Sequence, residues 1–125
     1  MEISLTDREA NLMDVLWEHG PSTVAEVRER LTDELAYNTV LTILRNLEAK
    51  GYVTHEEAGR AHRYLAAVTE DLAQRSAVQA LTHKLFKGSA ELLMTQLVSD
   101  KKLSARELDR ISAVLEERKR KRGRG

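Results

Sequence analysis

Residues 36–66, AYNTVLTILRNLEAKGYVTHEEAGRAHRYLA, decide the fold of this chain. The first part of the stretch predicts an amphipathic helix over 37–50, because its large apolar residues recur at helical spacing, at Val40, Ile43, Leu44 and Leu47. Gly51 ends this helix, since glycine readily adopts the left-handed backbone conformation that follows a helix. The opposite face of the helix carries small polar residues and a single arginine.

A short β-hairpin is predicted directly after that helix. The runs 52–57 and 61–66 favour strands, and residues 58–60 between them contain the glycine of a tight connection. If that glycine and the arginine after it form a two-residue turn, Glu56 faces Arg63 as a favourable pair of opposite charges. A helix followed by such a hairpin is the layout of a winged helix-turn-helix.

Two shorter helices are predicted before this stretch, and further helices after it. Capping boxes, in which a Ser or Thr is followed three residues later by Glu, stand at 6–9, 23–26 and 104–107 and mark three helix starts. Gly20 ends the first helix, and Trp17 near its end is expected in the core. The fold class is therefore mainly α with a small β-hairpin, a winged helix-turn-helix followed by C-terminal helices.

The C-terminal helices carry more apolar residues than a chain of this size is expected to bury locally. We expect these helices to pair with a second copy of the chain. The residues assigned to this dimerisation are Leu72, Val78, Leu81, Leu85, Leu92, Leu93, Leu97, Leu108, Ile111 and Leu115. The predicted domains are a winged-helix domain at 1–68, a helical dimerisation domain at 69–117 and a basic, disordered tail at 118–125.

Composition excludes several classes of protein. The chain has no cysteine, which excludes disulfides, thiolate metal sites and cysteine catalysis. No apolar run approaches the ~20 residues of a membrane span, and the first residues do not form a secretory signal, so a cytoplasmic protein is expected. The formal net charge is zero, but residues 1–68 hold seven Lys/Arg against twelve Asp/Glu, whereas residues 69–125 hold thirteen against eight.

The polar face of the helix over 37–50 is the candidate DNA-binding surface. An arginine there can bond guanine bidentately, asparagines can bond adenine, and threonines can contact bases or phosphates. The hairpin would contact the DNA backbone or the minor groove. The residues assigned to DNA binding are Asn38, Thr39, Thr42, Arg45, Asn46, Arg60, His62 and Arg63.

Five strings of the sequence match one known family: LT at 5–6, LMDVLW at 12–17, TVLTIL at 39–44, LEAKG at 47–51 and RAHRY at 60–64. On these strings the sequence resembles the BlaI/MecI/CopY family of winged-helix repressors, best known as penicillinase repressors. The resemblance covers roughly residues 3–117. It implies a homodimer that represses transcription by occupying a promoter, with two winged domains on a palindromic operator of the TACA/TGTA type.

The resemblance also implies how DNA is released. In the penicillinase branch a membrane sensor metalloprotease leads to cleavage of the repressor at an Asn-Phe pair, which aligns here with Gln96 and Leu97, a departure from that pattern. In the copper branch release depends on cysteine pairs, which this chain lacks, so a copper sensor is not expected. Asn46 is a further departure, because many members carry a basic residue there.

Other kinds of site receive less support. A surface metal site on His55 and His62 is an alternative, but the hairpin register places His55 opposite Tyr64 and His62 opposite Glu57, so the two histidines are not opposed. We expect no metal, no cofactor and no catalytic residue, because the Ser and Thr residues that can be placed serve as helix caps.

Two alternatives stay open for the function and for the tail. The zero net charge and the acidic first half favour a second hypothesis, a winged-helix protein-interaction module that does not bind DNA specifically. A small-molecule-responsive regulator is a variant of the DNA-binding hypothesis. The tail is either a DNA-grasping arm or a solubilising end, and the second is favoured because the family does not require a basic tail.

Overall fold

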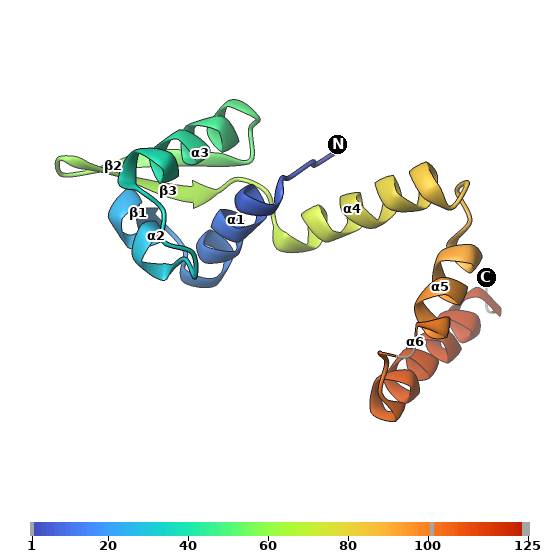
Figure 1. Cartoon of the computed structure of the whole chain (residues 1–125). Coiled ribbons are helices and arrows are strands. Elements are labelled where there is room, and N and C mark those ends of the chain that lie inside the picture. The colour runs from blue at the N-terminus through green and yellow to red at the C-terminus, as the bar shows by residue number, and fades with distance from the viewer. Residues whose placement is uncertain (1, 101, 124–125) are drawn as a thin grey trace. The chain divides into compact units, whose positions relative to one another are not determined.

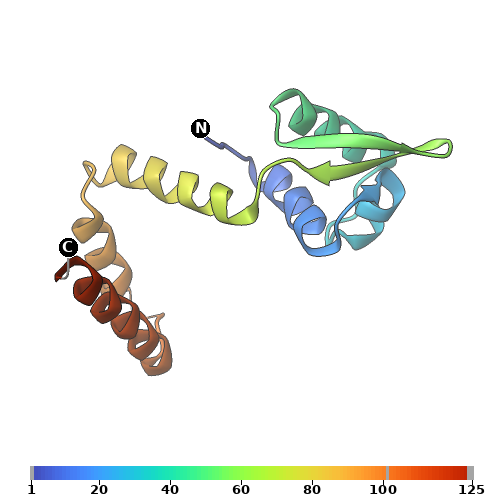
Figure 2. The ribbon, with the colours of Figure 1, turned by 180° about the vertical axis from the view of Figure 1, so that it is seen from behind.

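The computed structural model describes residues 2–100 and 102–123. The chain divides into two compact units, Met1–Leu81 and Thr82–Gly125, which are unit 1 and unit 2 below. Figure 1 shows the elements in chain order, and Figure 2 shows them from behind. They are α1 (Asp7–His19), β1 (Ser22–Thr23), α2 (Val24–Arg30), α3 (Tyr37–Ala49), β2 (Val53–Ala58), β3 (Ala61–Ala66), α4 (Glu70–Leu85), α5 (Ala90–Ser99) and α6 (Ala105–Gly123).

The three predicted capping boxes are confirmed. At the start of α1, the Glu9 amide donates to Thr6 Oγ1 at 3.2 Å and the Thr6 amide donates to Glu9 Oε1 at 2.9 Å. Thr23 makes the same pair of bonds at the start of α2, and Ser104 does so at the start of α6. Each capping box provides hydrogen-bond acceptors for backbone amides that have no partner within the helix. Because the residues that do so are only three positions apart, the helix starts can be predicted from the sequence.

A three-stranded antiparallel sheet, in the order β1-β3-β2, completes unit 1. The predicted hairpin register is confirmed, because Glu56 pairs with Arg63 and Ala58 pairs with Ala61. Gly59 in the turn has a φ of 66°, which a residue without a side chain adopts at little cost. The strand β1 was not predicted, because two residues are too short to show alternation. The β2–β3 hairpin, called the wing below, extends past the helices of unit 1 (Figure 1).

The core of unit 1 lies where α3 packs against α1, α2 and β2, while α1 and α2 also contact β3. The predicted apolar stripe of α3 supplies Val40, Leu44 and Leu47, which are fully buried, whereas Ile43 is half-buried. Trp17 packs against this core but is also only half-buried, and its indole N–H donates to the Val68 carbonyl at 2.9 Å. Apolar burial of this kind is the dominant favourable term in folding.

Unit 1 extends further along the chain than the predicted boundary at residue 68. The first half of α4 packs onto it, with Ala73 and Ser76 buried. The Ile3 amide donates to Ser76 Oγ at 2.7 Å, which attaches the segment before α1 to α4. Because a buried amide needs a partner, this bond makes the start of α4 part of the same folded unit.

Unit 2 contains α5, α6 and the end of α4. Neither α5 nor α6 has a buried residue over its described length. The structure differs here from the expectation of a disordered tail, because α6 continues through Gly123. Glu116 and Glu117 form ion pairs with Lys119, Arg120 and Lys121 one turn later, and cations near a helix C-terminus are favourable. No helix among the described residues is long and apolar enough to cross a membrane.

Candidate nucleic-acid interface

The polar face of α3 is exposed as the sequence predicts. Asn38, Thr42, Arg45 and Asn46 are exposed, and Thr39 is half-buried. The Thr42 hydroxyl donates to the Asn38 carbonyl at 2.8 Å. Since that proton is already used, Thr42 offers a partner its oxygen lone pairs and its methyl group rather than a donor.

An ion pair fixes the C-terminal end of α3. Lys50 Nζ lies 2.9 Å from Glu9 Oε1 and 2.8 Å from Glu9 Oε2, and the Glu9 residue is only 6% exposed. Burial acts to raise the pKa of Glu9, but the hydrogen bonds from Lys50 and Thr6 and the Lys50 charge together lower it. Glu9 thus serves the α1 capping box and holds the end of α3 at the same time.

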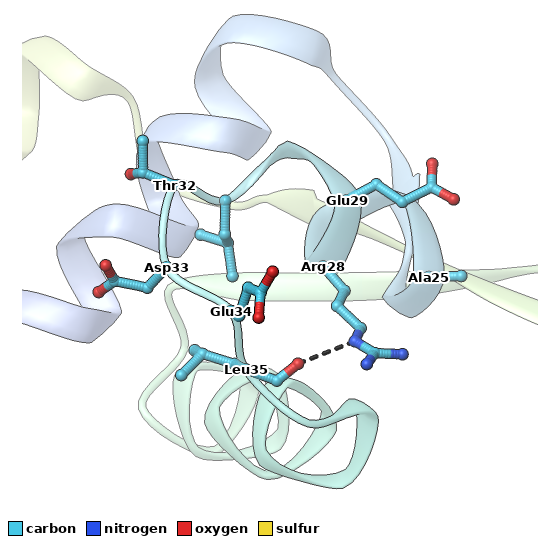
Figure 3. A pocket seen from close by; sticks show the side chains of 8 residues that line it. Ala25, Arg28, Glu29, Thr32, Asp33, Glu34 and Leu35 are labelled. Atoms are coloured by element: carbon cyan, nitrogen blue, oxygen red, sulfur yellow. Dashed lines mark hydrogen bonds between the residues drawn. The ribbon is translucent and has the colours of Figure 1, made fainter.

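The turn between α2 and α3 fixes the other end of α3. Arg28 Nε donates to the Leu35 carbonyl at 2.8 Å, just before α3 begins (Figure 3). An open cavity of about 550 Å³ lies beside this turn, lined by Ala25, Arg28, Glu29, Leu31, Thr32, Asp33, Glu34 and Leu35. Three of these residues are carboxylates, so this side of the helix-turn-helix is a poor site for phosphate.

A second cavity, the α3–wing groove, has the opposite electrostatic character. It measures about 310 Å³ and is lined by Thr23, Val24, Ala25, Tyr37, Leu41, Arg45, Arg60, Ala61, His62 and Tyr64. These residues include two arginines and a histidine but no carboxylate. The groove therefore brings together three of the predicted site residues, Arg45 from α3 and Arg60 and His62 from the wing, in a setting suited to an anion.

Arg63, which the sequence grouped with His62, lies on the opposite face of the wing, because successive side chains of a strand alternate. It is absent from the lining of the α3–wing groove. The pKa of Glu26 is lowered mainly by hydrogen bonds from Thr23, and the charges of Arg30 and, last, Arg63 add to that effect against some desolvation. The two neighbouring wing residues would thus meet different parts of a ligand.

The sequence interpretation missed a set of contacts that join α3 to the wing. His55 Nδ1 lies 2.5 Å from Glu48 Oε2, and the His55 and His62 rings stack at 4.6 Å with 16° between their planes. The register was right that these histidines are not directly opposed, but diagonal neighbours on one face of a hairpin also touch. No group of three or more His, Cys, Asp or Glu in the described part of the chain is arranged to hold a metal.

Tyr64 lies at the centre of this set. It is 3% exposed, and its ring centroid is 5.6 Å from that of His55. Arg45 on α3 and Tyr64 both line the α3–wing groove. Burial raises the pKa of the Tyr64 hydroxyl, the Glu48 carboxylate raises it further, and Arg45 partly offsets both.

Comparison with known proteins finds similarity along nearly the whole chain. The family model described as penicillinase repressor matches residues 5–117. The transcriptional regulator BlaI of Mycobacterium tuberculosis (strain H37Rv) is 35% identical over 117 residues, which are 90% of this chain and 83% of that protein. The penicillinase repressor of Bacillus licheniformis is 23% identical over 120 residues, 94% of each chain.

A solved structure resembles part of this chain. It is the monomeric form of Bacillus licheniformis BlaI in complex with the blaP half-operator, with a TM-score of 0.50 and 29% identity. The match covers 57% of this chain and 89% of that chain.

Proposed function

The chain belongs to the penicillinase repressor family, and we propose that it is a sequence-specific DNA-binding transcriptional repressor that acts by occupying a promoter. The observation that carries this proposal is the convergence of Arg45, Arg60 and His62 on a groove without a carboxylate. The half-operator complex of Bacillus licheniformis BlaI, which is 29% identical to this chain over the matched part, supports DNA as the partner.

In this proposal α3 enters the major groove. Its exposed face presents Asn38, Arg45 and Asn46 as hydrogen-bonding groups for base edges, while the methyl of Thr42 can contact thymine. Thr39 at the start of the helix can bond a phosphate or a base. The ion pair at Lys50 and the bond from Arg28 to the turn hold both ends of α3, which favours a preformed surface.

The wing contacts the DNA backbone beside α3. Arg60 and His62 face the groove, where a phosphate would accept hydrogen bonds from them, and Arg63 on the other face would meet a different phosphate. Because the net charge of the chain is zero, we expect modest affinity per domain and strong weakening as salt rises.

A homodimer on a palindromic operator of the TACA/TGTA type completes the proposal. Its support is the apolar surface of the C-terminal helices, where Leu85 is 69% exposed and Leu92 and Leu97 are about half exposed. Leu72, Val78, Leu81, Leu108 and Leu115 are also exposed, and Leu93 and Ile111 are half-buried. A second copy of the same surface would cover these residues.

Release from DNA would follow cleavage in the C-terminal region, or another signal. The bond between Gln96 and Leu97, the position aligned with the family's cleavage pair, lies within α5 and both residues are exposed. A protease must unwind a helix locally before it can cut, and α5 has no buried residue to resist that. A membrane sensor metalloprotease is the activating partner in this circuit.

The test is fluorescence anisotropy with a duplex bearing the TACA/TGTA palindrome and with a scrambled duplex, across a salt series. We expect the palindrome to be favoured, with Arg45→Ala weakening its binding by about 1–3 kcal/mol. Arg75→Ala, which removes an exposed arginine paired with Asp71 on α4, is the matched control and should leave binding unchanged. Equal, salt-insensitive binding of both duplexes, or none, would point instead to a protein-interaction module.

A further inference from the structure

The wing histidine proposed to contact a phosphate is stacked on a second histidine. His62 lies on β3 and lines the α3–wing groove, while His55 lies on β2. Their ring centroids are 4.6 Å apart with 16° between the ring planes. Stacking uses the face of the His62 ring, and hydrogen bonding uses the nitrogens at its edge. The stack is therefore compatible with a hydrogen bond from His62 to DNA.

The second histidine is bonded to α3. His55 Nδ1 lies 2.5 Å from Glu48 Oε2, with 36% and 32% of the two side chains exposed. Because an ionised carboxylate only accepts hydrogen bonds, Nδ1 is the nitrogen that carries the proton and donates it. Hydrogen bonds to a charged group are the stronger kind. One side chain each from α3, β2 and β3 thus forms a continuous contact from the helix to the wing.

We propose that Glu48 and His55 are positioning residues that hold the His62 ring in place for a DNA phosphate. This inference rests on the function proposed above. It gives a supporting role in DNA binding to a carboxylate of α3, although a carboxylate by itself repels DNA.

The outer part of the wing has little else to hold it. A hairpin of two strands is marginally stable by itself. Residues 54–63, all of which the structure describes, include no buried side chain, so apolar packing does not fix this segment. The His55 ring also lies beside the buried Tyr64, with 5.6 Å between the ring centroids. His55 therefore links the exposed His62 both to α3 and to the edge of the core.

Glu48 has two opposite effects on DNA binding in this arrangement. Its negative charge repels phosphates, so its removal should strengthen binding. Its bond to His55 orders the stack before DNA arrives, which reduces the side-chain freedom that binding must restrict, so its removal should weaken binding. Salt screens the repulsion but not the ordering. At physiological salt we expect the ordering effect to be the larger, and the sign of the change decides between the two.

The decisive experiment is a double-mutant cycle of His55→Ala and His62→Ala in the intact chain. Affinity for the palindromic duplex is measured by anisotropy at a salt concentration of about 0.15 M. His55→Ala removes the stack, and the energy of an aromatic pair corresponds to a loss of affinity of about 2- to 12-fold. In the His62→Ala background the same change should have no further effect, because the residue that His55 positions is absent.

Glu48→Ala and Glu57→Ala separate ordering from charge. Glu57 lies on β2 opposite His62, so both variants remove a carboxylate near the same surface, but Glu48 is the one bonded to His55. We expect Glu48→Ala to weaken binding by about 2- to 12-fold. The matched control, Glu57→Ala, should leave the affinity unchanged or raise it.

A measurement without DNA accompanies the cycle. The NMR signals of the His62 ring protons should move in His55→Ala, because the stacked ring that shields them is gone. Glu48→Ala should move the same signals, although its bond is to His55. A purely electrostatic role of Glu48 in DNA binding would leave the stack, and hence these signals, in place.

Different failures have different meanings. If His62→Ala weakens binding but His55→Ala does not, the positioning role is wrong and the proposed function stands. The inference is also overturned if His62→Ala has no effect, or if His55→Ala weakens binding equally in both backgrounds. If Glu48→Ala strengthens binding as Glu57→Ala does, Glu48 acts through its charge alone. If the wild-type chain does not distinguish the palindrome from the scrambled duplex, the proposed function fails first and the inference fails with it.

Discussion

Unit 1 and unit 2 use the same kind of helix in opposite ways. In unit 1 the apolar stripe of α3 is buried against two other helices and a sheet. In unit 2 the described residues of α5 and α6 include no buried side chain, although α5 is more apolar than α3. An apolar stripe therefore predicts that a helix packs against another surface. It does not predict whether that surface belongs to the same chain or to a second one.

The two units differ in how much burial of apolar side chains stabilises them. Unit 1 removes its large apolar side chains from water, which is the main driving force for folding. Unit 2 leaves comparable side chains in water, so a partner copy has most to gain there. The proposed division of labour is that unit 1 binds DNA and unit 2 joins two copies.

The largest expected effect contrasts a core leucine with an exposed one. Leu44→Ala should destabilise unit 1 by about 2–5 kcal/mol, because Leu44 is fully buried and a cavity would remain. Leu115→Ala should change the same transition by no more than about 0.5 kcal/mol, since Leu115 is half exposed in unit 2. Urea unfolding followed by the fluorescence of Trp17, the chain's one tryptophan, reports on unit 1 alone.

A charge on the exposed apolar surface should separate the proposed dimer. Leu85→Glu is expected to weaken self-association by about 2–4 kcal/mol, as for a central interface residue, without changing the Trp17 transition. Lys84→Glu introduces the same residue at the neighbouring exposed position and is the control. Analytical ultracentrifugation measures both, and a wild-type chain that is monomeric at micromolar concentration would remove the dimer from the account.

The buried ion pair of unit 1 should matter more than an exposed one. Lys50→Met leaves the Glu9 carboxylate buried without its cation, and we expect a loss of about 1–3 kcal/mol, moderated by the partial exposure of Lys50. Arg75→Met breaks the exposed pair with Asp71 and should cost less than about 1 kcal/mol. Equal losses in urea unfolding would contradict the structural role of Lys50.

The smallest effect concerns pH. The pKa of Glu9 is lower in the folded chain than in the unfolded one, so its contribution to stability is present in full above the unfolded pKa of about 4.3. That contribution is lost as the pH falls through the lower, folded pKa. Glu9→Gln should therefore flatten the acid limb of the stability curve of unit 1, and an unchanged acid limb would argue against this pKa shift.

The sequence was informative where the deciding contacts are local. Capping boxes, the glycine stops and the hairpin register depend on residues a few positions apart, and each was predicted correctly. The ion pair between Glu9 and Lys50 and the bond from Ile3 to Ser76 join distant segments, so no local pattern announces them. The stack of His55 on His62 was within reach, because the predicted register already placed them as diagonal neighbours.

The tail illustrates the opposite case. Residues 118–125 were predicted to be disordered from their charge, and residues 124–125 lie outside the described residues. Residues 118–123 are the end of α6, because arginine and lysine are good helix formers and here follow two glutamates at the spacing of ion pairs. The basic composition of this segment indicates that it is solvated, but it does not determine the backbone conformation. For the candidate site, the sequence predicted the exposed face of α3. It grouped Arg63 with His62, although the alternation of side chains along a strand places them on opposite faces of the wing.

The most direct test of the division between the two units compares a full palindromic duplex with a half-site duplex, using the intact chain in fluorescence anisotropy. If unit 1 binds DNA and unit 2 joins two copies, the palindrome should be bound at least about 100-fold more tightly, because the second domain binds at a high effective concentration. Equal affinity for the two duplexes, with one chain on each, would contradict the account.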